Sequence, residues 1–281
     1  MTTSDQQADG RLGEYDRMVL ADVAAWLEGE PGLAERVLGT VSGVSRAAVD
    51  RVLDAPPVRD AVRRATDELL DRLERLDASP ASPEPRLPSE PPADLLARAD
   101  AEADRYQQRV TRALSVQGAA AGAVSTNLLA AVLAVTTDVA AATVGLTRAS
   151  VGVLQLYGVP APRRRAIGIR TVLAAGERDP GVRRRELVAA VGAASTGGDG
   201  DVGRVIADQF GPRAVIEVAE QAIRRVARRR ALAFVPLLGA AAGAAVSNVM
   251  TRHVCETARQ TGRLYHLQER TGRPVDVLLS S

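Results

Sequence analysis

The chain has 281 residues, of which 46% are hydrophobic but only 2% aromatic, and its formal net charge is +2. All 36 basic side chains are arginine, which excludes a lysine Schiff base and a Walker-type phosphate lysine. One cysteine and two histidines are too few for an intrachain disulfide or for a zinc site made of four such ligands. Alanine and valine supply much of the apolar fraction, which favours closely packed helices over sheets.

The charge is unevenly distributed along the chain. Residues 1–105 hold 13 arginines against 22 acidic residues (−9), and residues 106–281 hold 23 arginines against 12 (+11). An acidic front half and a basic back half either attract each other or recruit a polyanionic partner. Residues 1–10 are polar and predicted to be disordered, and they lack the apolar core of a signal peptide, so we expect a cytoplasmic protein.

The first predicted elements form an N-terminal helical part, residues 11–77. Apolar residues recur at three- to four-residue spacing over 12–27, which predicts a helix ended by the Gly/Pro-rich residues 28–32. Two more helices are predicted over about 33–53 and 58–76. Six prolines between residues 78 and 93 then predict a flexible or polyproline-like linker, with a ligand for a proline-recognising domain as the alternative.

The main helical bundle is predicted over residues 94–270. An amphipathic helix over 94–112 leads into an uncharged stretch. Thr136, Thr137 and Asp138 offer N-cap chemistry for a helix over 139–157, which Gly158 and Pro160 end. Shorter helices are predicted over 163–176 and 181–195, and a long final helix is predicted to end near residue 270. Residues 271–281 are predicted to be a tail, and residues 11–270 one domain.

One decapeptide pattern occurs twice, as Gly-Ala-Ala-Ala-Gly followed by Asn five residues later. The members are Gly118, Gly122 and Asn127, and then Gly239, Gly243 and Asn248. Glycines four residues apart remove side-chain bulk from one helix face, so a second backbone can approach closely. The repeat predicts an all-α, multi-helix bundle with two central glycine-zipper helices packed closely and no sheet.

The same repeat allows a membrane interpretation. The uncharged runs 113–137 and 231–251 are long enough to cross a bilayer. Alanine, glycine and several polar residues make their transfer energy marginal, so buried helices of a bundle are favoured over two membrane spans.

Three stretches resemble the EcsC protein family of bacteria. Glu14-Tyr15 with Trp26 looks like the family's entry helix, and Asp138-Val139 with the later Tyr157-Gly158 resembles its central pattern. The segment 235–248, with Thr251, Val254 and Ala258, is similar to its C-terminal signature. The resemblance implies an all-helical protein, often encoded near an ABC-type exporter, with no established reaction.

A polar seam is predicted beside the two repeats. Asp138 is the only acidic residue between Asp104 and Glu177, and we expect it to pair with an arginine such as Arg252, with Asn127 and Asn248 nearby. The simpler alternative is that Asp138 caps the following helix and that both asparagines satisfy backbone groups at a helix crossing.

No catalytic, metal-binding or cofactor-binding residue is predicted. His253 and Cys255 are two residues apart, so on a helix they point in nearly opposite directions and do not chelate together. The loop around Ser195 lacks both a nucleophile motif and a phosphate-binding pattern.

Arginine clusters in the back half are the candidate contacts for anionic lipid headgroups. They are Arg163, Arg164, Arg165, Arg183, Arg184, Arg185, Arg228, Arg229 and Arg230. Nucleic acid is a less favoured partner because no aromatic residues interleave with them. The sequence therefore predicts a non-enzymatic accessory at a membrane surface that binds lipid, an apolar ligand or an ABC-type transporter component. An unrecognised hydrolase-like enzyme and an integral membrane protein are the alternatives.

Overall fold

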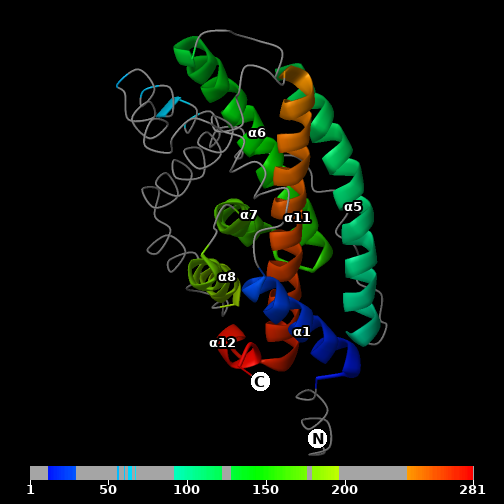
Figure 1. The fold of residues 1–281 in the computed structure, drawn as a ribbon. Helices are drawn as coiled ribbons and strands as arrows, with labels where there is room; N and C mark the ends of the chain where they lie inside the picture. Colours follow the sequence, from blue (N-terminus) through cyan, green and yellow to red (C-terminus); the bar gives the residue numbers. More distant parts are fainter. Residues whose placement is uncertain are drawn as a thin grey trace, which may run out of the picture.

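The computed structural model describes residues 12–29, 92–121, 128–175, 179–195 and 239–280, together with residues 56, 60, 63, 64 and 67. Across these ranges the chain is an all-α bundle without a strand, as the sequence predicts (Figure 1). The helices are α1 (Glu14–Glu28), α5 (Pro92–Ala121), α6 (Leu128–Leu156), α7 (Ala161–Ala175), α8 (Pro180–Ser195), α11 (Gly239–Thr271) and α12 (Val275–Leu278).

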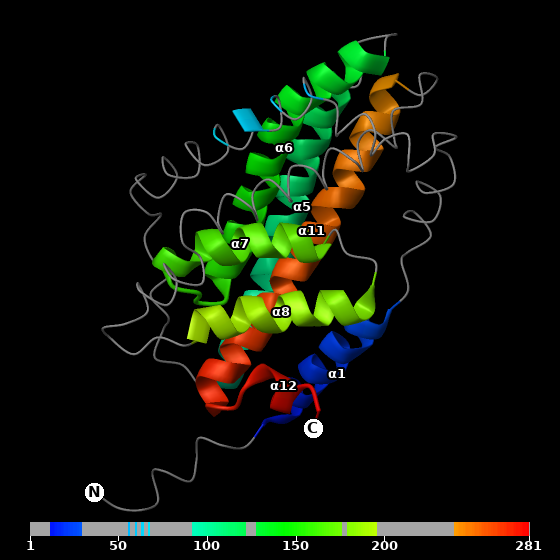
Figure 2. The same cartoon turned by 90° about the vertical axis from the view of Figure 1, so that its left-hand side faces the viewer.

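Three long helices, α5, α6 and α11, run side by side, and α7 and α8 lie across them (Figures 1 and 2). The helices α1 and α12 lie near the C-terminal end of α11 (Figure 2). One hydrophobic core joins these elements, because Val19 and Val23 of α1 pack in the same cluster as Leu154 of α6, Leu187 of α8 and Leu264 of α11. Within the described residues, α1 thus belongs to the same folded unit as the main bundle.

The helix ends follow local glycine chemistry. At the end of α6, Gly158 takes a positive φ of 79°, its N–H bonds to the carbonyl of Gln155, and the N–H of Val159 reaches the carbonyl of Leu154. This is the Schellman arrangement, which a residue without Cβ adopts most easily. Pro160 follows and α7 begins directly after it, so the predicted stop at residues 158–160 is confirmed.

The predicted helix start at Asp138 is wrong. The helix α6 begins at Leu128 and continues through Thr136, Thr137 and Asp138 without a break. Threonine and aspartate inside a helix cost only about 0.7 kcal/mol each relative to alanine. The surrounding alanine and leucine residues sustain the helix through this cost.

The predicted tail is also more ordered than expected. Val275 and Leu278 of α12 are each only 2% exposed and belong to the hydrophobic core. Gln268 accepts a hydrogen bond from the backbone N–H of Val275 (3.1 Å), which fixes the turn between α11 and α12. Two apolar side chains spaced one helical turn apart were a sufficient signal for packing.

The most extensive helix pair is formed by α5 and α11, which run antiparallel. Ser115 contacts Asn248, Asp104 pairs with Arg259, and Asp100 pairs with Arg263. The two residue numbers in each pair add up to the same total, so the register is constant over about 22 Å of helix.

The repeated glycines lie at one end of this helix pair. Gly118 is in the last turn of α5, and Gly239 and Gly243 are in the first turns of α11, whereas Gly122 lies outside the described residues. The register of α5 and α11, continued along both helices, brings Gly118 within two residues of the level of Gly243. Close packing of the glycine-zipper positions remains a prediction, because their surroundings are not described.

Close packing on glycine does occur at other positions. A Cβ added at Gly262 would come within 2.5 Å of the Tyr157 ring, and one at Gly152 would overlap the Tyr106 hydroxyl. At Gly145 and Gly168 it would meet Leu114 and Val151 at 2.8 and 2.9 Å. Missing side chains therefore let neighbouring helices and rings approach, as the repeat suggested, but at glycines outside the repeat.

In the described stretches of chain, no helix combines the length and the apolarity that crossing a bilayer requires.

Candidate functional site

The most elaborate polar site is centred on Asp100, a carboxylate of α5 that is only 7% exposed. Its Oδ1 accepts hydrogen bonds from the Tyr157 hydroxyl (2.5 Å) and Arg263 Nε (2.8 Å). Its Oδ2 accepts from the Tyr15 hydroxyl (2.6 Å) and Arg263 Nη2 (3.1 Å). Four donors thus use the full acceptor capacity of one buried carboxylate.

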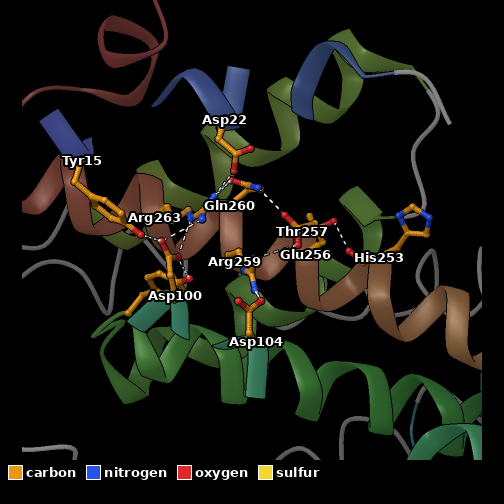
Figure 3. Close-up of polar contacts among 11 residues, drawn as sticks. Tyr15, Asp22, Asp100, Asp104, His253, Glu256, Thr257, Arg259, Gln260 and Arg263 are labelled. Carbon is orange, nitrogen blue, oxygen red and sulfur yellow. Dashed lines mark hydrogen bonds and ion pairs between the residues drawn. The ribbon is translucent and has the colours of Figure 1, made fainter. Parts of the chain in front are cut away.

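Arg263 of α11 extends this site towards α1 (Figure 3). Its Nη1 donates to Asp22 Oδ2 (2.5 Å) and to Gln260 Oε1 (3.3 Å), while Gln260 donates to Glu256 Oε1 (2.7 Å). We call Tyr15, Asp22, Asp100, Tyr157, Gln260 and Arg263 the Asp100 network. It joins α1, α5, the end of α6 and α11 at one place.

A second ion pair lies one helical turn along the same interface. Arg259 pairs with Asp104 of α5, and its Nη1 lies 3.8 Å from Glu256 Oε2 (Figure 3). The Asp104 side chain is 59% exposed, so water screens this pair more strongly than the pair of Asp100 and Arg263.

The protonation states of the Asp100 network are fixed near neutral pH. Burial raises the pKa of Asp100, but hydrogen bonds from Arg263, Tyr15 and Tyr157 outweigh it, so the pKa lies below its usual value. Burial and the hydrogen bond to Asp100 raise the pKa of Tyr15 to about 12. Burial, followed by the Asp100 charge, also raises the pKa of Tyr157. Both tyrosines therefore stay protonated and donate, while Asp100 stays ionised.

A third contact ties α1 to the end of α11. Asp16 is 1% exposed, pairs with Arg270 and accepts a hydrogen bond from the N–H of Gly13 (2.6 Å). His266 lies in the same region, and burial, followed by the Arg270 charge, lowers its pKa. Oδ1 of Asp16 and Nε2 of His266 are both buried without a hydrogen-bond partner.

Each of these ion pairs joins the acidic front half to the basic back half. Asp16, Asp22, Asp100 and Asp104 all precede residue 106, and their partners Arg259, Arg263 and Arg270 all follow it. Of the two possibilities that the charge distribution left open, attraction between the halves is confirmed for these pairs. These ion pairs orient α1 and α5 relative to α11.

The predicted polar seam is only partly described. Asn248 donates from Nδ2 to Ser115 Oγ (3.3 Å), and Arg252 is exposed. The helix α6 contains Asp138, whose side chain is outside the description, and Asn127 lies outside the described residues. The pairing of Asp138 with Arg252 stays a prediction, whereas the capping alternative is wrong because α6 starts at Leu128.

Some arginines of the predicted clusters make contacts within the protein, and others are exposed. Arg183 is buried, lies 5.2 Å above the Trp26 ring and donates to the Trp26 carbonyl (3.3 Å). Nε of Arg164 donates to the carbonyl of Val159. Arg184 and Arg185 are exposed, and Arg163 is half-buried. Arg165 lies in α7 with an undescribed side chain, and Arg228, Arg229 and Arg230 lie outside the described residues.

Cys255, Glu256 and His253 are further titratable side chains of α11. Cys255 is 1% exposed, and burial raises the pKa of its thiol to about 12, so it is not a nucleophile near neutral pH. Burial raises the pKa of Glu256, although its hydrogen bond with Gln260 acts in the opposite direction. His253 is half-buried on the same helix and is two residues from Cys255.

An open depression of about 420 Å³ lies between α8 and the C-terminal end of α11. Its lining consists of Val188, Gly192, Gln268, Glu269, Gly272, Pro274, Val275 and Asp276. A lining that brought together Asp138, a histidine and a serine would favour an enzyme, and these residues do not line this depression. An apolar tunnel that opened beside the arginine clusters would favour lipid binding, and the clusters do not line it either.

Comparison with known proteins does not identify a relative. No family model matches the chain, and no curated protein and no solved structure is significantly similar to it.

Sequence reasoning missed Asp100 and Arg263 as a pair. Asp100 stands between the buried residues Leu96, Ala99 and Ala103, so its position on the apolar face of α5 was the available signal. Tyr15 and Tyr157 were singled out in the sequence, but their common contact with Asp100 depends on tertiary structure.

Proposed function

We propose that this protein is a non-enzymatic accessory of the EcsC type that works at the cytoplasmic surface of a membrane and binds anionic lipid headgroups. The single observation that carries the proposal is that carboxylates of the acidic front half form ion pairs with arginines of α11. Asp16 and Asp100 are buried in ion pairs with Arg270 and Arg263, while Asp22 and Asp104, whose side chains are each 59% exposed, pair with Arg263 and Arg259. Arg105, Arg109 and Arg112 of α5 and Arg184 and Arg185 of α8 are exposed, and none of these four acids pairs with them.

The chemistry of the Asp100 network supports a binding role over an enzymatic one. Its carboxylate is saturated with hydrogen bonds, and its tyrosines hold their protons. A general acid or base needs a pKa near the working pH, and these groups have been moved away from it. The resemblance to the EcsC family adds an ABC-type transporter component as the neighbour expected at the membrane.

The test is sedimentation of the full chain with vesicles of phosphatidylcholine alone and with vesicles that also contain 30% phosphatidylserine. We expect binding to the anionic vesicles at about 0.1 M salt and release at about 1 M, where the Debye length falls from about 10 to 3 Å. Equal binding to neutral vesicles would indicate an apolar ligand instead, and absence of binding to both vesicles would refute the proposal.

A further inference from the structure

The exposed face of α5 carries a line of arginines that are not adjacent in the sequence and so form no cluster there. Arg98, Arg105, Arg109 and Arg112 are all exposed. Their spacings are seven, four and three residues, so at about 100° per residue they fall within about 60° of one another. At about 1.5 Å per residue the line is about 21 Å long. We call these four residues the α5 arginine stripe.

The orientation of the stripe is fixed by the opposite face of the same helix. Leu96, Asp100 and Thr111 are buried on that face, and α5 packs there against α11 and α6. In Figure 1, α5 lies at the edge of the bundle, on the opposite side of α11 from α7 and α8. The ion pairs of Asp100 and Asp104 with α11 hold α5 in this rotation, so the stripe points outward.

The surroundings of the stripe are weakly acidic and contain further arginines. Among the exposed acids of α5 whose side chains are described, Glu102 lies close to the stripe and Asp104 is paired with Arg259. The neighbouring helices α6 and α11 contribute the exposed residues Arg148 and Arg252. By the register of α5 and α11, Arg252 lies at the level of Thr111, near the end of the stripe.

We propose that the α5 arginine stripe is the face that contacts an anionic bilayer, an inference that rests on the function proposed above. Guanidinium groups bind phosphate oxygens in bidentate geometry, and a straight row on a rigid helix meets a flat array of headgroups without rearrangement. The exposed residues between the arginines include Ala101, Glu102 and Gln108. No exposed aromatic lies among them to stack on bases, which favours a membrane over single-stranded nucleic acid.

The experiment compares two triple variants that remove the same charge from different faces. The first is Arg105→Gln, Arg109→Gln and Arg112→Gln. The matched control is Arg17→Gln, Arg63→Gln and Arg273→Gln, which neutralises three exposed arginines that lie outside α5 and outside the predicted arginine clusters. A juxtamembrane arginine contributes about 1 kcal/mol, or about 5-fold in affinity, so the stripe variant should bind anionic vesicles roughly 100-fold more weakly. The control should lose less than about 10-fold.

The outcomes separate this inference from the proposed function. If the wild-type protein binds anionic vesicles and the control loses as much affinity as the stripe variant, or more, the stripe is the wrong face but the function stands. If the wild-type protein binds neither vesicle, both proposals fail. Displacement of the protein from vesicles by a double-stranded oligonucleotide at equal phosphate concentration would assign the stripe to nucleic acid. Unchanged circular dichroism and melting temperature of both variants show that binding, not folding, was altered.

Discussion

Asp100 shows how a single residue organises the contacts of four helices. Its carboxylate receives two tyrosine hydroxyls and a bidentate guanidinium, and each donor comes from a different part of the chain. Burying an ion pair is costly, but removal of one partner leaves an uncompensated charge, which costs more. The local energetics therefore depend on the pair, not on either residue alone.

A double-mutant cycle tests this dependence. Asp100→Asn and Arg263→Gln should each destabilise the protein by about 3–5 kcal/mol, and the double variant should lose clearly less than the sum. The cycle for Asp104→Asn and Arg259→Gln should give a coupling energy of only about 0–1 kcal/mol, because Asp104 is exposed. Urea denaturation of all six variants provides the free energies, and equal coupling in both cycles would contradict our account of burial.

Gly262 is the residue on which the Tyr157 ring depends. Its missing side chain lets the ring lie against α11, within 2.5 Å of where a Cβ would be, and hydrogen bonding to Asp100 prevents the ring from moving away. Gly262→Ala introduces overpacking of about 1–3 kcal/mol, while helix propensity regains about 1 kcal/mol. We expect a net loss of up to about 2 kcal/mol by urea denaturation.

Gly192 of α8 is the matched control for that substitution. A Cβ there has no neighbouring atom within 4 Å, so Gly192→Ala should stabilise the protein by about 0.5–1 kcal/mol through helix propensity alone. Stabilisation by both substitutions would show that the Tyr157 ring is not constrained.

At the scale of elements, α12 illustrates how a short helix closes the core. Leu278 is 2% exposed, whereas its neighbour Val277 is 49% exposed. Leu278→Ala should cost about 2–4 kcal/mol, and Val277→Ala should change stability by less than about 0.5 kcal/mol. Thermal unfolding followed by circular dichroism measures both, and similar small effects would mean that α12 is only loosely attached.

The pairing of α5 with α11 fixes the rotation of α5 about its own axis and so decides which of its side chains are exposed. Two ion pairs and the contact of Ser115 with Asn248 fix the register, and threonine hydroxyls of α11 such as Thr251 and Thr261 are satisfied by carbonyls four residues earlier. Polar residues can thus be buried in this helix without partners from other helices. The face of α5 that carries Asp100 packs against α11, so the arginine stripe on the opposite face of α5 is exposed.

At the scale of the whole molecule, the titrations of His266 and Asp100 contribute to the dependence of stability on pH. The pKa of His266 is lowered in the folded state, so folding favours the neutral ring, and this contribution is lost as pH falls below about 6.5. The groups around the ring carry both signs, since Arg270 opposes protonation while Asp16 and Asp100 favour it. The pKa of Asp100 is also lowered, and its contribution is lost only as pH falls below 3.8.

We therefore expect two separate decreases of the melting temperature on acidification. The first should begin near pH 6.5 and disappear in the variant His266→Gln, and the second should begin below about pH 4 and diminish in Asp100→Asn. Melting temperatures measured from pH 7 to pH 3 at constant ionic strength give the test. A single decrease that neither substitution alters would assign the acid sensitivity to other groups.

The sequence by itself determined the helical class, most described helices and the division of charge. Alanine-rich segments with a 3.6-residue period form helices in almost any packed context, and the glycine and proline at residues 158–160 end α6 by local geometry. The prediction from local sequence was wrong at Asp138, where the residues suggested a helix N-cap but α6 continues without a break.

Only the tertiary structure decided which charges are internal. Asp100 and Arg263 are 163 positions apart, and nothing in their neighbourhoods pairs one with the other in preference to Asp138 or Arg252. Their contact follows from the antiparallel register of α5 and α11, which the packing of complete helix faces selects. The same packing buries Arg183 against Trp26 and exposes the stripe on α5, because a helix that buries one face must present the other.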